Sequence, residues 1–314
     1  MGTTIFRLAI ALGVVGLALL PLFADEYVHG VLVGLMSTVT LASAWALFSG
    51  PTKYISLATV AFFGLGAYTV AVFADHLPFA TVLGIAGLIG LAVALVVGLA
   101  TLRLAGIYFT IFSFGLAELV RQLITWFETT INGKLGRYIF VDVGARGIFW
   151  LLLALAIVTI ALRWWIERSR YGLAVHAIGD DEQVARHAGV NVTAVKLGLF
   201  AASAVIITLA GAIQAPRWTY VEPSIVFNPT ISFITLIAAL LGGATRLWGP
   251  VLGAVPLFFF FDWLSVRFPD QFSILLGLSF VAIVFLVPHG IYDLVLDWRA
   301  RVARPIAESK NSHA

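Results

Sequence analysis

The sequence predicts an all-α, polytopic membrane protein with about ten transmembrane helices. Of its 314 residues, 61% are hydrophobic and only 11% are charged, whereas a soluble chain has roughly 25% charged residues. Apolar runs recur along the chain, most of them close to the ~20 residues that a helix needs to cross about 30 Å of hydrocarbon. Gly, Pro and charged residues separate these runs, as is typical of the loops between spans.

Ten runs are candidate spans: 5–23, 29–48, 54–74, 79–101, 105–126, 147–167, 195–215, 228–246, 249–264 and 271–292. We expect one transmembrane domain over residues 1–298 and a tail at 299–314. The first run follows Arg7 and ends at Leu22-Phe23-Ala24, which is also the outline of a signal peptide. We expect a retained anchor instead, because the run is long enough to span and lacks a small residue at the expected position before Ala24.

Basic residues predict the orientation, since Lys and Arg are more frequent in cytoplasmic loops. With the N-terminus inside, twelve basic residues are cytoplasmic, namely Arg7, Lys53, Arg103, Arg168, Arg170, Arg186, Lys196, Arg246, Arg299, Arg301, Arg304 and Lys310. Five are outside, namely Lys134, Arg137, Arg146, Arg217 and Arg267. Both termini and the polar loop 168–196 are therefore expected to be cytoplasmic. Ten spans also divide into five and five of opposite orientation, the parity of an inverted repeat.

Several residues inside or next to the spans are candidates for a translocation path. Gly64, Gly66 and Tyr68 lie in a glycine-rich run, which favours either close helix packing or a broken helix beside a path. Thr130 and Asn132 lie in the outer segment 127–146, which suits a plain loop or a short re-entrant piece.

Glu118 and Arg121 lie three residues apart on one face of the span 105–126. An ionisable group in hydrocarbon costs at least ~2.5–3.5 kcal/mol at the centre of a span, so the pair should face protein or water. The two side chains either hold neighbouring helices together or contact a zwitterionic solute.

The loop 168–196 is the one long polar passage of the chain. Asp180 or Asp181 can cap a short helix, and Gly189 is a plausible stop. Val184 and Ala188, four residues apart, would give that helix an apolar stripe one turn long. Because so short a helix is not stable alone, it needs a surface to hold it.

Other classes of protein leave no signature. The chain has no cysteine, and its net charge of +3 gives no indication of a nucleic-acid partner. There is no Gly-x-x-x-x-Gly-Lys-[Ser/Thr] loop for a nucleotide and no HExxH motif for a metal. The histidines lie at span ends, in loops or in the tail, at positions 29, 76, 176, 187, 289 and 313. A channel filter is not recognisable either, which favours a transporter.

The chain resembles the LivM-type membrane subunit of ABC importers of branched-chain amino acids over residues 49–264. The motifs that carry the resemblance are Ser56-Leu57, Gly64, Gly66-Ala67-Tyr68, Arg103–Phe109, Glu118, Ser169–Gly172, Glu182, Ala185, Gly189–Asn191, Ala210–Ala212, Gly242-Gly243 and Trp248–Ala254. The order and spacing of these motifs are specific, although no single one is.

The resemblance implies a coupling loop that docks on a cytoplasmic ATPase and transmits nucleotide-driven closure. Its residues would be Gly179, Asp180, Asp181, Glu182, Ala185, Arg186 and Gly189. It also implies a second related membrane subunit, two ATPase subunits that use ATP and Mg²⁺, and an external solute-binding protein, in the cytoplasmic (inner) membrane. This chain itself would bind no cofactor and would not be an enzyme. Ser56 would join the path.

Departures from the family pattern leave alternatives open. Leu173 and Gly179 stand where basic residues are usual, so docking should depend on shape and on Glu182 and Arg186. Ala58-Thr59 stands where the family commonly has Gly-His, which puts the substrate in doubt. An importer of urea or amides and an ion-gradient-driven secondary transporter are the alternatives.

Overall fold

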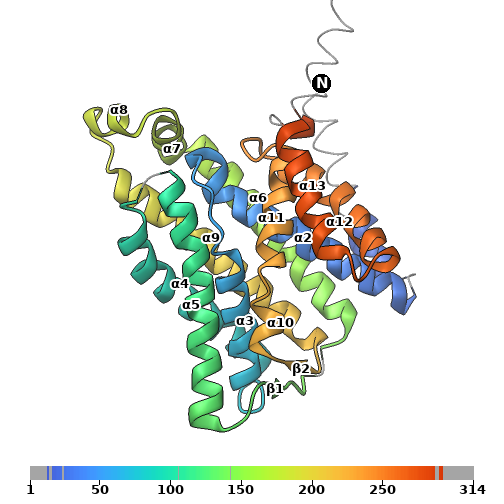
Figure 1. The fold of residues 1–314 in the computed structure, drawn as a ribbon. Coiled ribbons are helices and arrows are strands. Elements are labelled where there is room, and N and C mark those ends of the chain that lie inside the picture. Colours follow the sequence, from blue (N-terminus) through green and yellow to red (C-terminus); the bar gives the residue numbers. More distant parts are fainter. Residues whose placement is uncertain are drawn as a thin grey trace, which may run out of the picture.

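A computed structural model describes residues 13, 16–22, 25–104, 106–141, 143–286 and 290–292 of the chain. It is a bundle of helices with one two-stranded sheet (Figure 1). Within these described residues, seven helices are long and apolar enough to cross a membrane, and two shorter helices are also apolar. Most of the first predicted span, 5–23, and the whole tail, 299–314, lie outside the described residues.

The helices follow the predicted order. The first half contains α2 (Glu26–Thr52), α3 (Thr59–Phe73), α4 (Phe79–Thr101), α5 (Ile107–Phe127), the π-helical turn η1 (Glu128–Asn132) and strand β1 (Arg137–Tyr138). Next come α6 (Ala145–Arg168), α7 (Arg170–Asp180), α8 (Glu182–His187), α9 (Val192–Gln214), the turn η2 (Ala215–Arg217) and strand β2 (Tyr220–Val221). The last are α10 (Pro223–Val226), α11 (Thr230–Gly242), α12 (Gly249–Arg267) and α13 (Phe272–Leu286).

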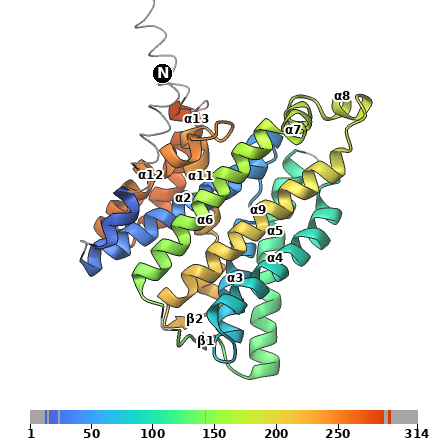
Figure 2. The same cartoon turned by 180° about the vertical axis from the view of Figure 1, so that it is seen from behind.

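The two ends of the bundle differ. Helices α7 and α8 lie at one end, here named the α8 end, and the β1–β2 sheet lies at the other, here named the β end (Figures 1 and 2). The long helices α2 and α9 pack against each other and run in opposite directions. Lys53, just after α2, and Lys196, early in α9, both contact residues of the α7–α8 region.

The packing of the first half recurs in the second. Helices α3 and α4 pack against α9, and α11 and α12 pack in the same way against α2. Helix α5 contacts α3 and α4, as α13 contacts α11 and α12. The core therefore forms at two places. In each, two helices of one half, α3 and α4 or α11 and α12, pack against the long helix of the other half, α9 or α2.

Glycines allow the closest of these contacts. A Cβ on Gly66 of α3 would overlap the carbonyl oxygen of Thr208 in α9, and one on Gly211 would overlap that of Phe63. Gly253 of α12 meets Ala238 of α11 in the same manner. The glycine-rich runs of the sequence thus serve tight helix packing, one of their two predicted roles.

The predicted span 54–74 is helical only from Thr59, because residues 53–58, here named the extended segment, form no helix and return into the bundle. Trp45 Nε1 donates a hydrogen bond of 2.7 Å to the Ser56 carbonyl oxygen. Leu57 is bonded on both sides, since its N–H donates to Ser113 Oγ at 2.9 Å and its carbonyl accepts from Ser232 Oγ at 3.0 Å. Side chains from α2, α5 and α11 thus replace the bonds that a helix would make, as unwound backbone at membrane depth requires.

The segment 127–146, predicted to lie outside the membrane, is more ordered than a plain loop. The chain continues α5 by the turn η1, and β1 then pairs antiparallel with β2, Arg137 opposite Val221 and Tyr138 opposite Tyr220. This pairing fastens the segment to the connection between α9 and α11.

Candidate functional site

The polar loop 168–196 folds as two short helices instead of the one that the sequence predicts. Ser169 Oγ accepts from the N–H of Tyr171 at 3.2 Å and caps α7. A Cβ on Gly172 would overlap carbonyl oxygens at the end of α6, so glycine permits the sharp corner between α6 and α7. Helix α7 was missed because its sequence, with two glycines, has weak helix propensity.

Helix α8 begins and ends as expected. Asp181 is its N-cap, and Oδ1 accepts from the N–H groups of Gln183 at 2.8 Å and Val184 at 3.1 Å. Gly189 has a φ of +84°, which favours glycine. The N–H groups of Gly189 and Val190 bond back to Arg186 and Ala185, the pattern of a Schellman C-cap.

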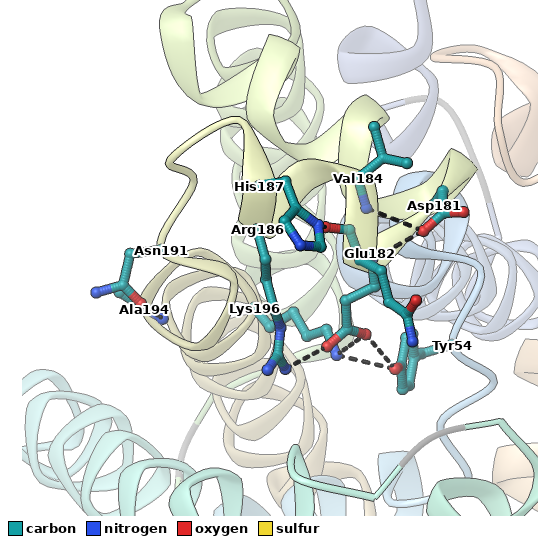
Figure 3. Close-up of polar contacts among 10 residues, drawn as sticks. Tyr54, Asp181, Glu182, Val184, Arg186, His187, Asn191, Ala194 and Lys196 are labelled. Carbon is teal, nitrogen blue, oxygen red and sulfur yellow. Dashed lines mark hydrogen bonds and ion pairs between the residues drawn. The ribbon is translucent and has the colours of Figure 1, made fainter.

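Four side chains converge beneath α8 to form what we call the Glu182 cluster: Tyr54, Glu182, Arg186 and Lys196 (Figure 3). Glu182 Oε2 accepts from Lys196 Nζ at 2.7 Å and from Tyr54 Oη at 2.8 Å. Glu182 Oε1 accepts from Arg186 at 2.8 Å. Lys196 Nζ also donates to Tyr54 Oη at 2.9 Å and lies 4.0 Å from the centre of the Tyr54 ring.

The cluster holds Glu182 as a carboxylate. Partial burial alone would raise its pKa, but hydrogen bonds from Lys196, Tyr54 and Arg186 outweigh burial and lower the pKa to about 2. Only 1% of the Lys196 side chain is exposed, and a buried ammonium is costly unless it is paired. Glu182 therefore turns inward and neutralises Lys196.

A second contact ties the loop to α2. A Cβ on Gly179 would overlap the carbonyl oxygen of Pro51, so glycine lets α7 lie directly on the end of α2. Asp180 accepts from Lys53 Nζ at 3.1 Å, but both side chains are largely exposed, and such pairs stabilise little. The steric fit at Gly179 is thus the stronger part of this contact.

Helix α8 has an inner and an outer apolar face. Ala185 packs inward with Ile178 and Val192 in a small buried cluster. Val184 points outward with 63% of its surface exposed, and Leu173 on α7 is exposed as well. Ala188, four residues after Val184 and therefore on the same face of α8, is exposed as well, so the predicted one-turn apolar stripe lies on the outer face.

At the β end, Glu128 forms a separate buried site. Its side chain is 1% exposed and accepts from Arg137 Nη2 and from Asn132 Nδ2, both at 2.8 Å. Tyr68 Oη lies near enough for the charges of Glu128 and Arg137 to act on it, although its hydroxyl lacks a hydrogen bond to the described residues. Thr130 is exposed on the same turn.

The residues proposed to line a path do not form one site. Ser56 lies in the extended segment, and Gly64 faces the ring of Phe227. Glu118 and Arg121 form an ion pair on α5, Arg121 Nε being 2.9 Å from Glu118 Oε2. The pair lies on the outer surface of the described bundle, with 43% and 32% of the two side chains exposed.

The family described as "Branched-chain amino acid transport system / permease component" matches residues 27–284. The chain belongs to this family. With its apolar helices, membership makes it a multi-pass membrane protein. The matched region contains the Glu182 cluster, the extended segment 53–58 and the Glu128 site.

Individual relatives agree with the family. The chain is 29% identical to "High-affinity branched-chain amino acid transport system permease protein LivM" of Salmonella typhimurium, over 74% of this chain and 62% of that protein. Identity to the LivM protein of Escherichia coli K12 is 28%, over 81% of this permease and 65% of the relative. The chain thus spans less than two thirds of either relative.

A shorter likeness extends to sugar permeases. The chain is 32% identical to "Xylose transport system permease protein XylH" of Haemophilus influenzae, over 35% of this chain and 30% of the relative. It is 26% identical to "Ribose import permease protein RbsC" of Escherichia coli K12, over 36% of each. No solved structure matches the chain.

Sequence reasoning missed two members of the Glu182 cluster as such. Lys196 was noted only as a basic residue at the edge of the loop, and Tyr54 was not singled out. The signal was present, because an ionisable residue inside an apolar helix needs a partner, and Lys196 lies four residues after the start of α9. Nothing in the spacing identifies Tyr54, which reaches Glu182 only because segment 53–58 is not helical.

Proposed function

We propose that the chain is the membrane-spanning subunit of an ATP-driven importer that translocates branched-chain amino acids by alternating access. The α8 end would face the cytoplasm and the β end the outside. ATP hydrolysis, with Mg²⁺, would occur on two partner ATPase subunits, and an external binding protein would deliver the solute. The chain would contribute conformational change and no chemistry.

One observation carries this proposal: a short capped helix is fixed from within and presents apolar residues outward. The Glu182 cluster joins α8 to the start of α9, and the Gly179 contact joins the preceding helix α7 to the end of α2. Val184 and Leu173 remain exposed on the outer side. Force applied to α8 by an ATPase would therefore reach the two central helices. If the ATPase contacts α8 differently in two conformations of the permease, it can bias the equilibrium between them.

The internal packing pattern supports an inverted repeat, whose two halves would move relative to each other during transport. Helices α2–α5 would correspond to α9 and α11–α13, and the undescribed first span to α6. Antiparallel α2 and α9 agree with opposite orientations of the halves. The extended stretch before α3 and the irregular stretch between α9 and α11 would be corresponding breaks, where transporters place their paths.

The ion pair on α5 supports a second permease subunit. An exposed Glu118–Arg121 pair within a span is unfavourable against lipid, so protein or water should cover this face in the assembly. We propose that the related subunit packs there. Because the chain has no cysteine, Leu119→Cys gives a single thiol on this exposed helix, and it should cross-link to the partner. A lipid-exposed thiol that only lipid-soluble reagents label would contradict the contact.

Uptake in inverted or right-side-out vesicles tests the function. We expect leucine uptake by the assembled importer to need ATP and added binding protein, and to persist when proton and sodium gradients are dissipated. Uptake that follows an ion gradient and ignores ATP would establish the secondary transporter instead. Sugars must be tested in parallel, because permeases named for xylose and ribose match about a third of the chain; urea and small amides complete the panel.

A further inference from the structure

A cavity of about 290 Å³ lies between the two halves of the bundle, in the half toward the β end. Its walls come from α2, α9, α11 and α12, with Phe63 of α3 and Phe272 of α13 closing it. The volume is near the lower end of the ~300–1,000 Å³ of small-molecule sites. It lies away from the Glu182 cluster, the Glu118 pair and the Glu128 site.

The lining is mostly apolar with a few polar groups. Phe258, Phe261 and Trp218 supply aromatic surface, while Ser37 Oγ donates to Gln214 Oε1 at 2.9 Å within the wall. The aromatic and aliphatic part of this surface accepts a branched aliphatic side chain, whose burial away from water is favourable.

One charged side chain lines this cavity, and a second of opposite sign lies beside its wall at Gly34 without being part of the lining. Asp262 of α12 lines it, and no described residue forms an ion pair with its carboxylate. The Arg217 guanidinium reaches Gly34 in the wall, with Nη1 3.9 Å from the position of a Cβ there. Arg217 likewise has no ion-pair partner within the described part of the chain.

The contacts at Gly34 show how Arg217 and Asp262 lie relative to each other. The Phe258 ring also meets Gly34, and Asp262 follows Phe258 by four residues, hence on the same face of α12. An acid within a span is unfavourable unless water, protein or a ligand meets it. An unpaired acid and an unpaired base beside one aromatic cavity form a surface complementary to a zwitterion.

We propose that this cavity is a binding site for an α-amino acid with an aliphatic side chain. The Asp262 carboxylate accepts from the ligand ammonium group, Arg217 donates to the ligand carboxylate, and the side chain enters the aromatic lining. This site rests on the proposed function, because the imported amino acid would bind here during its passage, between the two halves of one subunit.

Protection of a single thiol tests the site in the complete importer, reconstituted in nanodiscs. Thr38 lines the cavity, and since the chain lacks cysteine, Thr38→Cys supplies one reactive group. We expect millimolar leucine to slow its modification by a methanethiosulfonate reagent about tenfold, the effect of a charge-assisted contact. Ser273→Cys, which is exposed near the β end and outside the cavity, is the control and should not respond.

Ligand analogues identify the role of each charge. Leucinamide lacks the carboxylate and 4-methylpentanoate lacks the ammonium group, so both should protect Thr38→Cys about tenfold less than leucine. Arg217→Gln should abolish the preference of leucine over leucinamide, and Asp262→Asn the preference over 4-methylpentanoate. Arg267→Gln and Asp270→Asn, exposed near the same end, should leave both preferences intact.

The outcomes separate this site from the proposed function. If ATP-driven leucine uptake is present but leucine leaves Thr38→Cys unprotected, the site is wrong and the function stands. Protection by leucine without ATP-driven uptake supports the site and refutes the function. Protection by xylose in place of leucine, or by a change of nanodisc lipid alone, overturns the amino-acid site.

Discussion

Lys196 Nζ lies 2.7 Å from Glu182 Oε2 and joins the second turn of α9 to the first residue of α8. The lysine is buried and the carboxylate is partly exposed, so each needs the other in a different way. Glu182 keeps Lys196 neutralised, and Lys196 keeps α8 in a defined position over the end of α9. The pair is therefore the contact through which a displacement of α8 would move α9 and the core of the bundle.

Breaking the pair at Glu182 should loosen α8. Glu182→Ala leaves the Lys196 ammonium buried without its carboxylate, at a cost of about 2–4 kcal/mol in the local docking free energy. Hydrogen exchange over residues 171–196 in nanodiscs measures this loss as faster exchange. Adding Lys196→Met should restore part of the protection, because the unpaired charge is removed; strictly additive effects would show that the two residues do not interact.

The exposed pair Lys53–Asp180 is the matched control. Lys53→Met should change exchange in the loop by no more than about 0.5 kcal/mol, since exposed ion pairs contribute little. A loss as large as that of Glu182→Ala would mean that charge at the loop surface, and not the Glu182–Lys196 pair, fixes α8.

The loop should tolerate acid to an unusually low pH. The pKa of Glu182 is lowered to about 2, against about 4.3 for a free glutamate. A lowered folded-state pKa stabilises the folded form above pH ~4.3, and the contribution declines as the pH falls toward 2. Exchange in residues 171–196 should therefore show added opening only below pH ~4, and Glu182→Gln should remove that pH dependence. Opening that begins near pH 6 would contradict this assignment.

Gly179→Ala should separate α7 from α2. The added Cβ would overlap the Pro51 carbonyl oxygen, a backbone atom that cannot move without shifting the end of α2. We expect normal insertion but at least about a fivefold loss of transport per ATP hydrolysed, because a misplaced contact transmits force poorly. Gly198→Ala in α9, where a Cβ meets nothing within 4 Å, is the control and should transport normally.

The extended segment should depend on Ser232. Its hydroxyl donates to the Leu57 carbonyl at 3.0 Å and accepts from the Val60 N–H at 3.0 Å. Ser232→Ala leaves both backbone groups unpaired and should cost about 1–3 kcal/mol, seen as a lower melting temperature in detergent. Ser279→Ala removes only a hydrogen bond to its own helix, so the melting temperature of this variant should be close to that of the parent protein. Equal losses of stability in the two variants would show that the bonds of Ser232 to the extended segment are not specifically important.

Composition and the length of apolar runs were enough to predict an all-α membrane protein, because burial in lipid constrains every span in the same way. The Asp181 cap and the stop at Gly189 were also predictable, since both depend on local chemistry. The break at 53–58 was not, because Trp45, Ser113 and Ser232 replace its helical bonds from distant helices. The ten-span count and the inverted repeat stay predictions.

The candidate site shows the same division. Sequence alone located the loop and Glu182 but did not predict the direction of the carboxylate. Its true direction depends on Lys196 and Tyr54, which only the packing of α9 and segment 53–58 brings beneath α8. Tyr68, Asn132 and Thr130 lie together at the Glu128 site, whereas Glu118, which sequence grouped with them in one path, lies apart on α5 for the same reason.

The central claim is that the outer face of α8 docks on an ATPase. Val184→Arg changes that exposed face and leaves the Glu182 cluster untouched, so it separates docking from folding. The ratio of leucine imported to ATP hydrolysed, measured in proteoliposomes with the binding protein present, tests the claim most directly. We predict that this ratio falls at least about tenfold in Val184→Arg, the loss expected when a buried apolar contact becomes an unpaired charge, with unchanged insertion and loop protection. A ratio equal to that of the parent protein would contradict the claim.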